Sequence, residues 1–220
     1  MAINKSDCEI KETALDFKKH WNEAYLNNKT EKLGWFEDKS EQTLTLINEA
    51  KLSKDALILN VGAGSSTLID TLLADGFSNI IANDLSEEAL ESLKNRVGEN
   101  DKVKFIVDDL LNPSKLNKIK NIDLWNDRAV LHFFLKEGEI KAYFKLLKKV
   151  LKANGFVVIA VFAKNGAEKC CGLSVKRYDI EMLKNELGTD FELKNSFNYT
   201  FVNPFGGERP YIYALFQRIN

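Results

Sequence analysis

The sequence predicts an α/β fold in which a doubly wound, seven-stranded sheet has an antiparallel last strand. From residue 56 onward, short apolar runs alternate with amphipathic segments of helical length. This alternation is typical of parallel strands joined by right-handed helical crossovers. Near the end of the chain, only a turn rich in glycine and proline separates two further apolar runs. These two runs predict an antiparallel hairpin, which brings the expected number of strands to seven.

The individual elements follow from the apolar spacing and from the residues at the ends of each run. We expect strands at 56–61, 79–83, 103–107, 122–126, 156–162, 191–201 and 210–218. We expect helices at 9–26, 40–52, 66–75, 87–97, 114–119, 137–153 and 179–187. Capping or stop residues flank several of these helices, namely Ser86, Gly76, Gly98 and Gly155.

Length and composition limit the classes of protein to consider. A chain of 220 residues suits one structural domain, with a Rossmann-like core at 56–220 behind a helical lid or substrate segment at 1–55. The net charge of −1 provides no basic field for nucleic acid. No apolar run approaches the roughly 18 residues of a membrane span. The three cysteines, an odd number, argue against a secreted disulfide framework. We therefore predict a cytoplasmic protein without nucleic-acid or membrane partners.

The most informative stretch is a buried strand that enters a glycine turn. Its sequence ALILNVGAGSS includes Gly62 and Gly64, and glycines allow a ligand to approach the backbone closely. The next apolar run ends at Asp84, twenty residues beyond Gly64. An acid at the tip of that strand can accept hydrogen bonds from both hydroxyls of a ribose. The two features together predict a site for a cofactor that contains adenosine.

Three kinds of cofactor compete for this turn. A dinucleotide site prefers a third glycine where this chain has Thr67, and a P-loop needs a lysine that is absent here. A turn with two glycines suits a cofactor that presents an amino-acid end instead of a pyrophosphate. A nicotinamide-dependent oxidoreductase therefore remains an alternative, which the missing glycine and the terminal hairpin disfavour.

With this order of elements, residues from about 20 to 218 resemble the class I, seven-β-strand S-adenosylmethionine-dependent methyltransferases. Five motifs carry the resemblance: Asn60-Val61-Gly62-Ala63-Gly64, Asn83-Asp84-Leu85-Ser86, Val107-Asp108-Asp109-Leu110, Ile122–Arg128 and the turn Leu151–Gly155. The antiparallel last strand is the family's topological mark. The family usually has Asp or Glu where this chain has Asn60.

The resemblance implies S-adenosylmethionine as the cofactor and S-adenosylhomocysteine as its product. In this family Asp84 would bind the ribose, Asp109 the adenine amino group, and Leu110 would line the ring. The implied cofactor-binding residues are Asn60, Gly62, Ala63, Gly64, Asp84, Leu85, Asp109, Leu110 and Asn126. A lid that excludes water could form from four aromatic residues before the core, namely Trp21, Tyr25, Trp35 and Phe36. We expect Trp21 and Trp35 to contact the cofactor.

The resemblance leaves the methyl acceptor open. The Gly64–Leu68 stretch and the His20–Tyr25 and Gly34–Glu37 segments are similar to a branch that contains protein-lysine methyltransferases. The segments Asp127–Phe134 and Cys170–Tyr178 resemble a group of bacterial methyltransferases instead. Since no insertion is large enough for an obvious docking domain, we predict a small-molecule acceptor, with a protein acceptor as the alternative. A binding module that has lost transfer is the non-enzymatic alternative.

Methyl transfer is an in-line displacement, so proximity and alignment can provide much of the acceleration. A general base is needed only if the acceptor must first lose a proton. The candidate catalytic residues are Asp127 and Arg128, which should face the opening after the fourth strand, and His132, for which a core position is the competing interpretation. No histidine lies near Cys170 and Cys171, so we expect small buried thiols there and no metal site.

Overall fold

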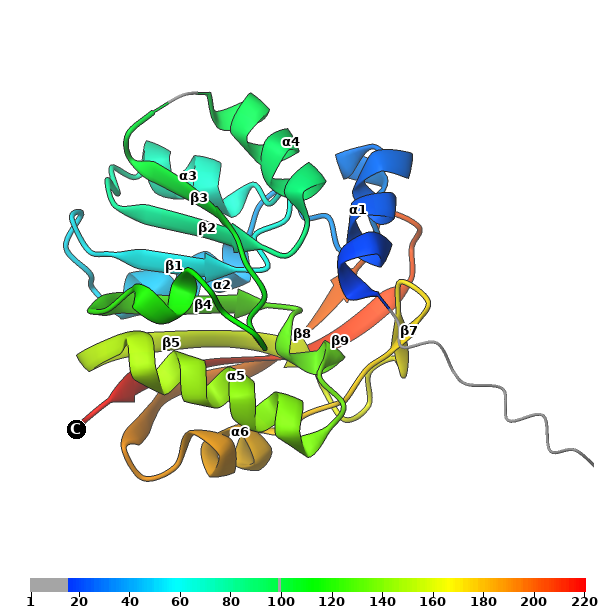
Figure 1. Ribbon diagram of the computed structural model, residues 1–220. Coiled ribbons are helices and arrows are strands. Elements are labelled where there is room, and N and C mark those ends of the chain that lie inside the picture. Colours follow the sequence, from blue (N-terminus) through cyan, green and yellow to red (C-terminus); the bar gives the residue numbers. More distant parts are fainter. Residues whose placement is uncertain (1–15, 99) are drawn as a thin grey trace, which may run out of the picture.

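The computed structural model describes residues 16–98 and 100–220, and a seven-stranded sheet forms its centre (Figure 1). The strands are β1 (Ile58–Val61), β2 (Ile80–Asp84), β3 (Val103–Val107), β4 (Ile122–Arg128), β5 (Leu151–Phe162), β8 (Phe191–Val202) and β9 (Glu208–Arg218). Their order across the sheet is β3-β2-β1-β4-β5-β9-β8. β1 to β5 pair in parallel, whereas β9 is antiparallel to both β5 and β8. The predicted fold class, with its antiparallel last strand, is confirmed.

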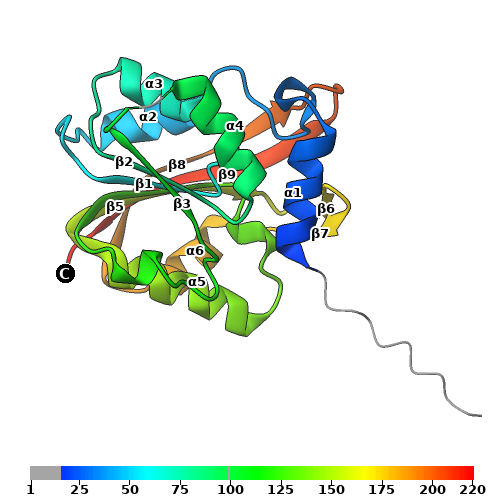
Figure 2. The same cartoon turned by 45° about the horizontal axis from the view of Figure 1, so that its top comes forward.

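Helices cover both faces of the sheet (Figures 1 and 2). The α-helices are α1 (Phe17–Asn27), α2 (Glu41–Glu49), α3 (Leu68–Ala74), α4 (Glu87–Val97), α5 (Glu137–Val150) and α6 (Ile180–Leu187). Three short 3₁₀ helices are η1 (Thr30–Lys32), η2 (Leu116–Lys118) and η3 (Leu131–Phe133). α2, α3 and α4 lie on one face, and α5 and α6 lie on the other. α1 stands across the end of the sheet toward which β1 and β4 point, beside α4.

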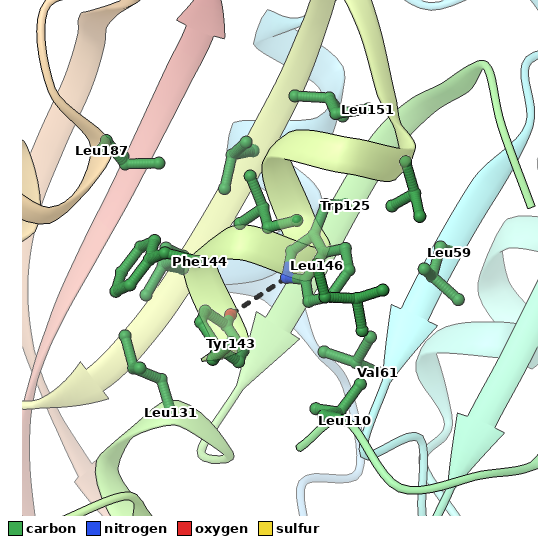
Figure 3. Close-up of a cluster of buried hydrophobic side chains, with 14 of the residues drawn as sticks. Leu59, Val61, Leu110, Trp125, Leu131, Tyr143, Phe144, Leu146, Leu151 and Leu187 are labelled. Carbon is green, nitrogen blue, oxygen red and sulfur yellow. Dashed lines mark hydrogen bonds between the residues drawn. The ribbon is translucent and has the colours of Figure 1, made fainter. Parts of the chain in front are cut away.

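Two hydrophobic layers result from this arrangement, one on each face of the sheet. Strand residues alternate between them, because successive side chains of a strand point to opposite faces. In β4, Leu124 belongs to the layer under α2 and α3, while Trp125 belongs to the layer under α5. Figure 3 shows the second layer, where Trp125 Nε1 donates a hydrogen bond of 3.0 Å to the hydroxyl of Tyr143 on α5. Burial of this indole therefore leaves its N–H satisfied.

Local sequence explains where the helices begin and end. The Ser86 hydroxyl accepts from Ala89 N at 3.1 Å and so caps α4. Gly98 ends the same helix with φ +75°, a conformation that favours glycine. The predicted helix at 87–97 coincides with α4.

Several predicted boundaries were wrong. β4 continues for two residues beyond 126, and α5 ends at Val150, after which β5 begins directly at Leu151. Residues 114–119 form only the short 3₁₀ helix η2. A small hairpin of β6 (Lys169–Cys170) and β7 (Leu173–Ser174) was not predicted. In each case pairing with neighbouring strands or loop contacts outweighed the local pattern.

The N-terminal predictions are tested only in part. The first half of the helix expected at 9–26 lies outside the described residues, as does Cys8, and the described half is α1. The helix expected at 40–52 is α2. Within the part of the chain that the structure describes, we find no helix that has both the length and the apolar character to cross a bilayer.

Candidate functional site

Two adjoining cavities lie at the carboxyl ends of the parallel strands. The larger cavity encloses about 940 Å³ of space, partly open to solvent, and is lined mainly by apolar side chains from α1 and from the ends of β2, β3 and β4. The smaller cavity, about 560 Å³, lies between the start of α2 and the glycine turn. Four residues line both cavities and form their boundary: Tyr25, Trp35, Gly62 and Arg128.

The glycine turn has a backbone that other residues would strain. Gly62 and Gly64 have φ values of +56° and +53°. A Cβ on Gly62 would lie 2.1 Å from Val130 Cγ2, and one on Gly64 would lie 2.2 Å from the hydroxyl of Tyr25. The hydroxyl of Tyr25 therefore covers Gly64, which lines neither cavity. The structure thus shows why both positions are glycine.

Asp84 joins the tip of β2 to this turn. Its Oδ2 accepts from Gly64 N at 2.8 Å, and its Oδ1 accepts from Ser86 N at 2.8 Å. Burial raises the pKa of Asp84 above its ordinary value, although these backbone hydrogen bonds oppose the rise. Each carboxylate oxygen can accept more than one hydrogen bond, so both keep capacity for a ligand in the larger cavity.

The far wall of the larger cavity comes from the loop after β3. Leu85, Asp109 and Leu110, the residues that the sequence suggested for adenine, all line it. Asp109 Oδ1 also accepts from Leu111 N at 2.8 Å. The neighbouring Asp108 holds the loop in shape, because its carboxylate accepts hydrogen bonds from the backbone N–H groups of residues 114, 115 and 116.

A cluster of aromatic side chains lies on the other side. Trp21 on α1 makes edge contacts with Trp35, at 5.5 Å between ring centroids, and with Phe133, at 5.0 Å. Trp35 Nε1 donates to the Tyr25 hydroxyl at 3.2 Å. These four side chains all line the larger cavity. Phe36 lines the smaller cavity instead.

The smaller cavity is more polar. Asn60 on β1 and Asn126 on β4 are opposite each other in the sheet, and Asn126 Nδ2 donates to Asn60 Oδ1 at 2.5 Å. Both side chains are buried, and both line this cavity together with Ala63. Each of the three was predicted to bind the cofactor.

Arg128 spans the boundary between the cavities. Its Nη1 donates to the Trp35 carbonyl at 3.0 Å, and its Nε donates to the Tyr213 hydroxyl at 3.3 Å. Its Nη2 lies 2.8 Å from Glu37 Oε1. The guanidinium also lies over the ring of Phe201, 5.1 Å from the centroid. Arg128 thus ties residues 35–37 to the sheet.

Asp127 and His132 line neither cavity, contrary to the expectation that Asp127 faces the opening. Residues 127 and 128 belong to β4, so their side chains point to opposite faces of the sheet. Asp127 lies on the α5 side and accepts hydrogen bonds from Tyr143 Oη at 2.6 Å, Val130 N at 2.9 Å and Leu131 N at 3.0 Å. His132 is fully buried among aromatic rings, and burial lowers its pKa to about 3. In this geometry neither side chain reaches a substrate proton.

The two cysteines differ from the expected buried thiols. Cys171 is exposed at the tip of the β6–β7 hairpin, while Cys170 is half-buried and lines the larger cavity. Burial raises the pKa of the Cys170 thiol to about 11, so it is not an activated nucleophile. Residues 16–98 and 100–220 contain no group of ligands that could hold a metal ion.

Comparison with known proteins agrees with this geometry. Residues 58–155, from β1 to the turn in β5, match the family described as "Methyltransferase domain". This stretch is similar to methyltransferase domains, and the whole chain has the fold of S-adenosylmethionine-dependent methyltransferases of class I. This family uses S-adenosylmethionine as its methyl donor, and the fold carries its topological mark.

Similar proteins include curated and solved examples. The methyltransferase is 31% identical over 133 residues to EEF1A lysine methyltransferase 2 from Danio rerio; this stretch is 57% of the present chain and 56% of that relative. Its fold matches a SAM-dependent methyltransferase from Anabaena variabilis with a TM-score of 0.70 at 15% identity, covering 91% and 93% of the two chains. It also matches the N-methyltransferase NodS from Bradyrhizobium japonicum with a TM-score of 0.67 at 14% identity, covering 91% and 100%.

The residues of the methyltransferase fit S-adenosylmethionine. The larger cavity offers a carboxylate at Asp84 for ribose hydroxyls and apolar walls at Leu85 and Leu110 for an adenine. The smaller cavity lies on the other side of Gly62 and offers polar groups for the amino-acid end of the cofactor. The sequence analysis named Glu37 only as part of the Gly34–Glu37 segment and did not name Thr43, although both residues line the smaller cavity. No motif or periodicity marks either position, because each residue reaches the cavity only through the tertiary packing of residues 35–49 on the sheet.

We expect Gly64→Ala to weaken both the methyltransferase fold and cofactor binding. The left-handed backbone costs an L-residue roughly 1–2 kcal/mol, and the added Cβ displaces the Tyr25 hydroxyl from the turn. The free energy of unfolding in urea should fall by about this amount, and calorimetry should show about a tenfold loss of S-adenosylhomocysteine affinity. Gly138→Ala on α5 is the control, since a Cβ there meets open space. Wild-type behaviour of Gly64→Ala would contradict the assigned role of the turn.

Proposed function

We propose that this protein transfers a methyl group from S-adenosylmethionine to the side-chain amine of a lysine in a protein. The observation that carries this proposal is the 31% identity to a relative named EEF1A lysine methyltransferase 2. That identity covers 56% of the relative, so the acceptor is inferred from the shared part only. We place the activity in the cytoplasm as part of the proposal, since the thiols of Cys170 and Cys171 are free.

The bound sulfonium supplies an activated methyl carbon, and the protein's own residues provide alignment and a dry site. The glycine turn and Asp84 hold the adenosine part in one orientation, which converts transfer into a step between aligned partners. Trp21, Trp35 and Phe133 pack together over the larger cavity and exclude water from it.

The apolar lining of the larger cavity also favours the neutral form of an acceptor amine. A lysine amine attacks only when it is neutral, and an apolar environment disfavours the charged ammonium. Aromatic side chains and Val130 dominate the lining of the larger cavity, where an acceptor would meet the methyl group. We therefore propose that desolvation, without a dedicated base from Asp127 or His132, prepares the amine.

The test is transfer of a tritiated methyl group to purified Danio rerio EEF1A, with the position of the label determined by peptide mass spectrometry. Label on a lysine that is absent with the Asp84→Asn variant supports the proposal. If wild-type protein binds S-adenosylhomocysteine but labels no lysine, a protein-lysine acceptor is ruled out for this target. Binding without transfer to any acceptor would instead match a non-catalytic binding module.

A small-molecule acceptor is the second candidate, and the mainly apolar lining of the larger cavity favours it. The Trp21–Trp35–Phe133 cluster leaves a compact apolar chamber that suits a small aromatic or aliphatic amine or thiol. A panel of such compounds, monitored by production of S-adenosylhomocysteine, distinguishes the two candidates. Turnover with a compound in the panel, and none with the protein, would favour this alternative.

A further inference from the structure

The smaller cavity contains buried polar atoms without a hydrogen-bond partner among the described residues. They are Thr43 Oγ1 and Asn126 Oδ1. Thr43 and Asn126 are each 1% exposed. Unpaired buried polar groups are uncommon, because each costs free energy that a partner would recover. Two of them around one cavity indicate a ligand that supplies the missing partners.

Glu37 adds a negative charge to the same cavity. Its side chain is 10% exposed, and its Oε1 forms an ion pair of 2.8 Å with Arg128 Nη2. The Thr67 hydroxyl donates to the Glu37 carbonyl at 3.1 Å, which fixes this backbone beside the end of the glycine turn. The carboxylate and the guanidinium therefore stand together at the cavity wall, with the capacity to take further partners.

The polar set complements a zwitterion. A carboxylate and an amide oxygen can accept from an ammonium, while a guanidinium N–H and a hydroxyl can donate to a carboxylate. Asn60, where the family usually has an acid, brings no charge, and its amide oxygen already accepts from Asn126. Within this cavity Glu37 is therefore the nearest substitute for the missing acid, and it comes from residues 35–37 instead of β1.

The position of the cavity agrees with the length of the cofactor. Asp84 lies at the end of β2 and Asn126 on β4, with β1 between them. Two strand spacings are roughly 10 Å, a distance that the chain from a ribose to an amino-acid end can cross over Gly62. Gly62 lines both cavities, so the crossing point has no side chain.

We propose that the smaller cavity binds the amino-acid end of S-adenosylmethionine, with Glu37 in place of the acid missing at Asn60, Arg128 and Thr43 on the carboxylate, and Asn126 on the ammonium. This inference rests on the proposed function only through the identity of the cofactor. In the free protein Glu37 and Arg128 neutralise each other. When the zwitterion binds, its ammonium and its carboxylate join Glu37 and Arg128 in an array of four alternating charges. The attraction between these charges is stronger in a site of low dielectric constant than in water.

The first test compares two ligands on one variant by calorimetry. S-adenosylhomocysteine has the amino-acid end, whereas 5′-methylthioadenosine keeps the adenosine and the sulfur but lacks that end. Glu37→Gln should weaken S-adenosylhomocysteine about tenfold to a hundredfold and 5′-methylthioadenosine less than about threefold. Glu181→Gln is the matched control, because it removes the same charge from an exposed ion pair on α6. Any general loosening of residues 35–37 affects both ligands and cancels in their ratio.

The second test uses Thr43→Val, which replaces a hydroxyl with a methyl group of similar size. Since Thr43 Oγ1 lacks a partner among the described residues, the free variant should have a higher midpoint of thermal unfolding than wild type. Its affinity for S-adenosylhomocysteine should fall about fivefold to tenfold, while that for 5′-methylthioadenosine should stay unchanged. A purely structural role for Thr43 cannot produce these opposite signs.

The outcomes of these tests distinguish the assignment of the smaller cavity from the proposed function. Equal weakening of both ligands by Glu37→Gln, or unchanged affinity of Thr43→Val for S-adenosylhomocysteine, would overturn the assignment of the smaller cavity and leave the proposed function in place. A folded wild-type protein that binds neither ligand would instead remove the cofactor, and with it both proposals.

Discussion

Asp84→Asn is expected to reduce the affinity for S-adenosylhomocysteine by at least about thirtyfold. Hydrogen bonds to a charged group contribute roughly 1.5–3 kcal/mol each, and a ribose offers two hydroxyls to this carboxylate. Asn is a better test than Ala, because it keeps an acceptor for the backbone N–H of Gly64 or of Ser86, which Asp84 holds at 2.8 Å each. Ala would remove both of these contacts and loosen the glycine turn itself.

Calorimetry at several pH values sharpens this test. Burial raises the pKa of Asp84, so its carboxylate takes up a proton at a higher pH than an ordinary Asp. The wild-type affinity should therefore decrease as the pH is lowered toward that raised pKa, whereas the affinity of Asp84→Asn should not follow this decrease. Asp75→Asn, beyond the end of α3, is the control. Undiminished binding by a folded Asp84→Asn protein would contradict the placement of the ribose.

Asp127→Ala is expected to lower the free energy of unfolding by about 3–5 kcal/mol, a large fraction of the roughly 5–15 kcal/mol that stabilises a domain. The substitution leaves three buried donors without their acceptor, namely the Tyr143 hydroxyl and the N–H groups of Val130 and Leu131. Tyr143→Phe removes one of these donors and should cost about 1–2 kcal/mol. Urea denaturation of both variants measures the difference. Equal losses would show that the backbone contacts of Asp127 contribute little.

The same carboxylate predicts how stability depends on pH. Burial outweighs the three hydrogen bonds and raises the pKa of Asp127 to about 6 in the folded protein, above the roughly 3.9 of an unfolded chain. Between these values the folded state binds more protons than the unfolded state. The stability that proton binding by Asp127 adds is therefore complete below about pH 4 and is lost as the pH rises through about 6, whereas the three hydrogen bonds that this carboxylate accepts remain. Asp127→Asn should lack this dependence.

Positions in the glycine turn and at the strand ends were predictable from sequence because their function depends on local order. A glycine pair after a buried strand and an acid at the end of the next strand must meet in any parallel sheet of this order, since carboxyl ends of parallel strands share one edge. Gly62, Asp84 and Leu110 accordingly lie where the sequence analysis placed them. The boundary of β4 was less predictable, because pairing with β1 and β5 extends the strand through Arg128.

By itself the sequence determined the class of fold, the kind of cofactor and the residues that follow one another around the glycine turn. Only the tertiary structure decided which faces these residues occupy and which distant residues join them. Because side chains alternate along β4, Asn126 and Arg128 face α2 while Asp127 faces α5. β4 extends two residues beyond the predicted end at 126, and this extension determines on which face Asp127 and Arg128 lie. Glu37 meets Arg128 across 91 positions of the chain through packing of residues 35–37 on the sheet, a contact that no local pattern encodes.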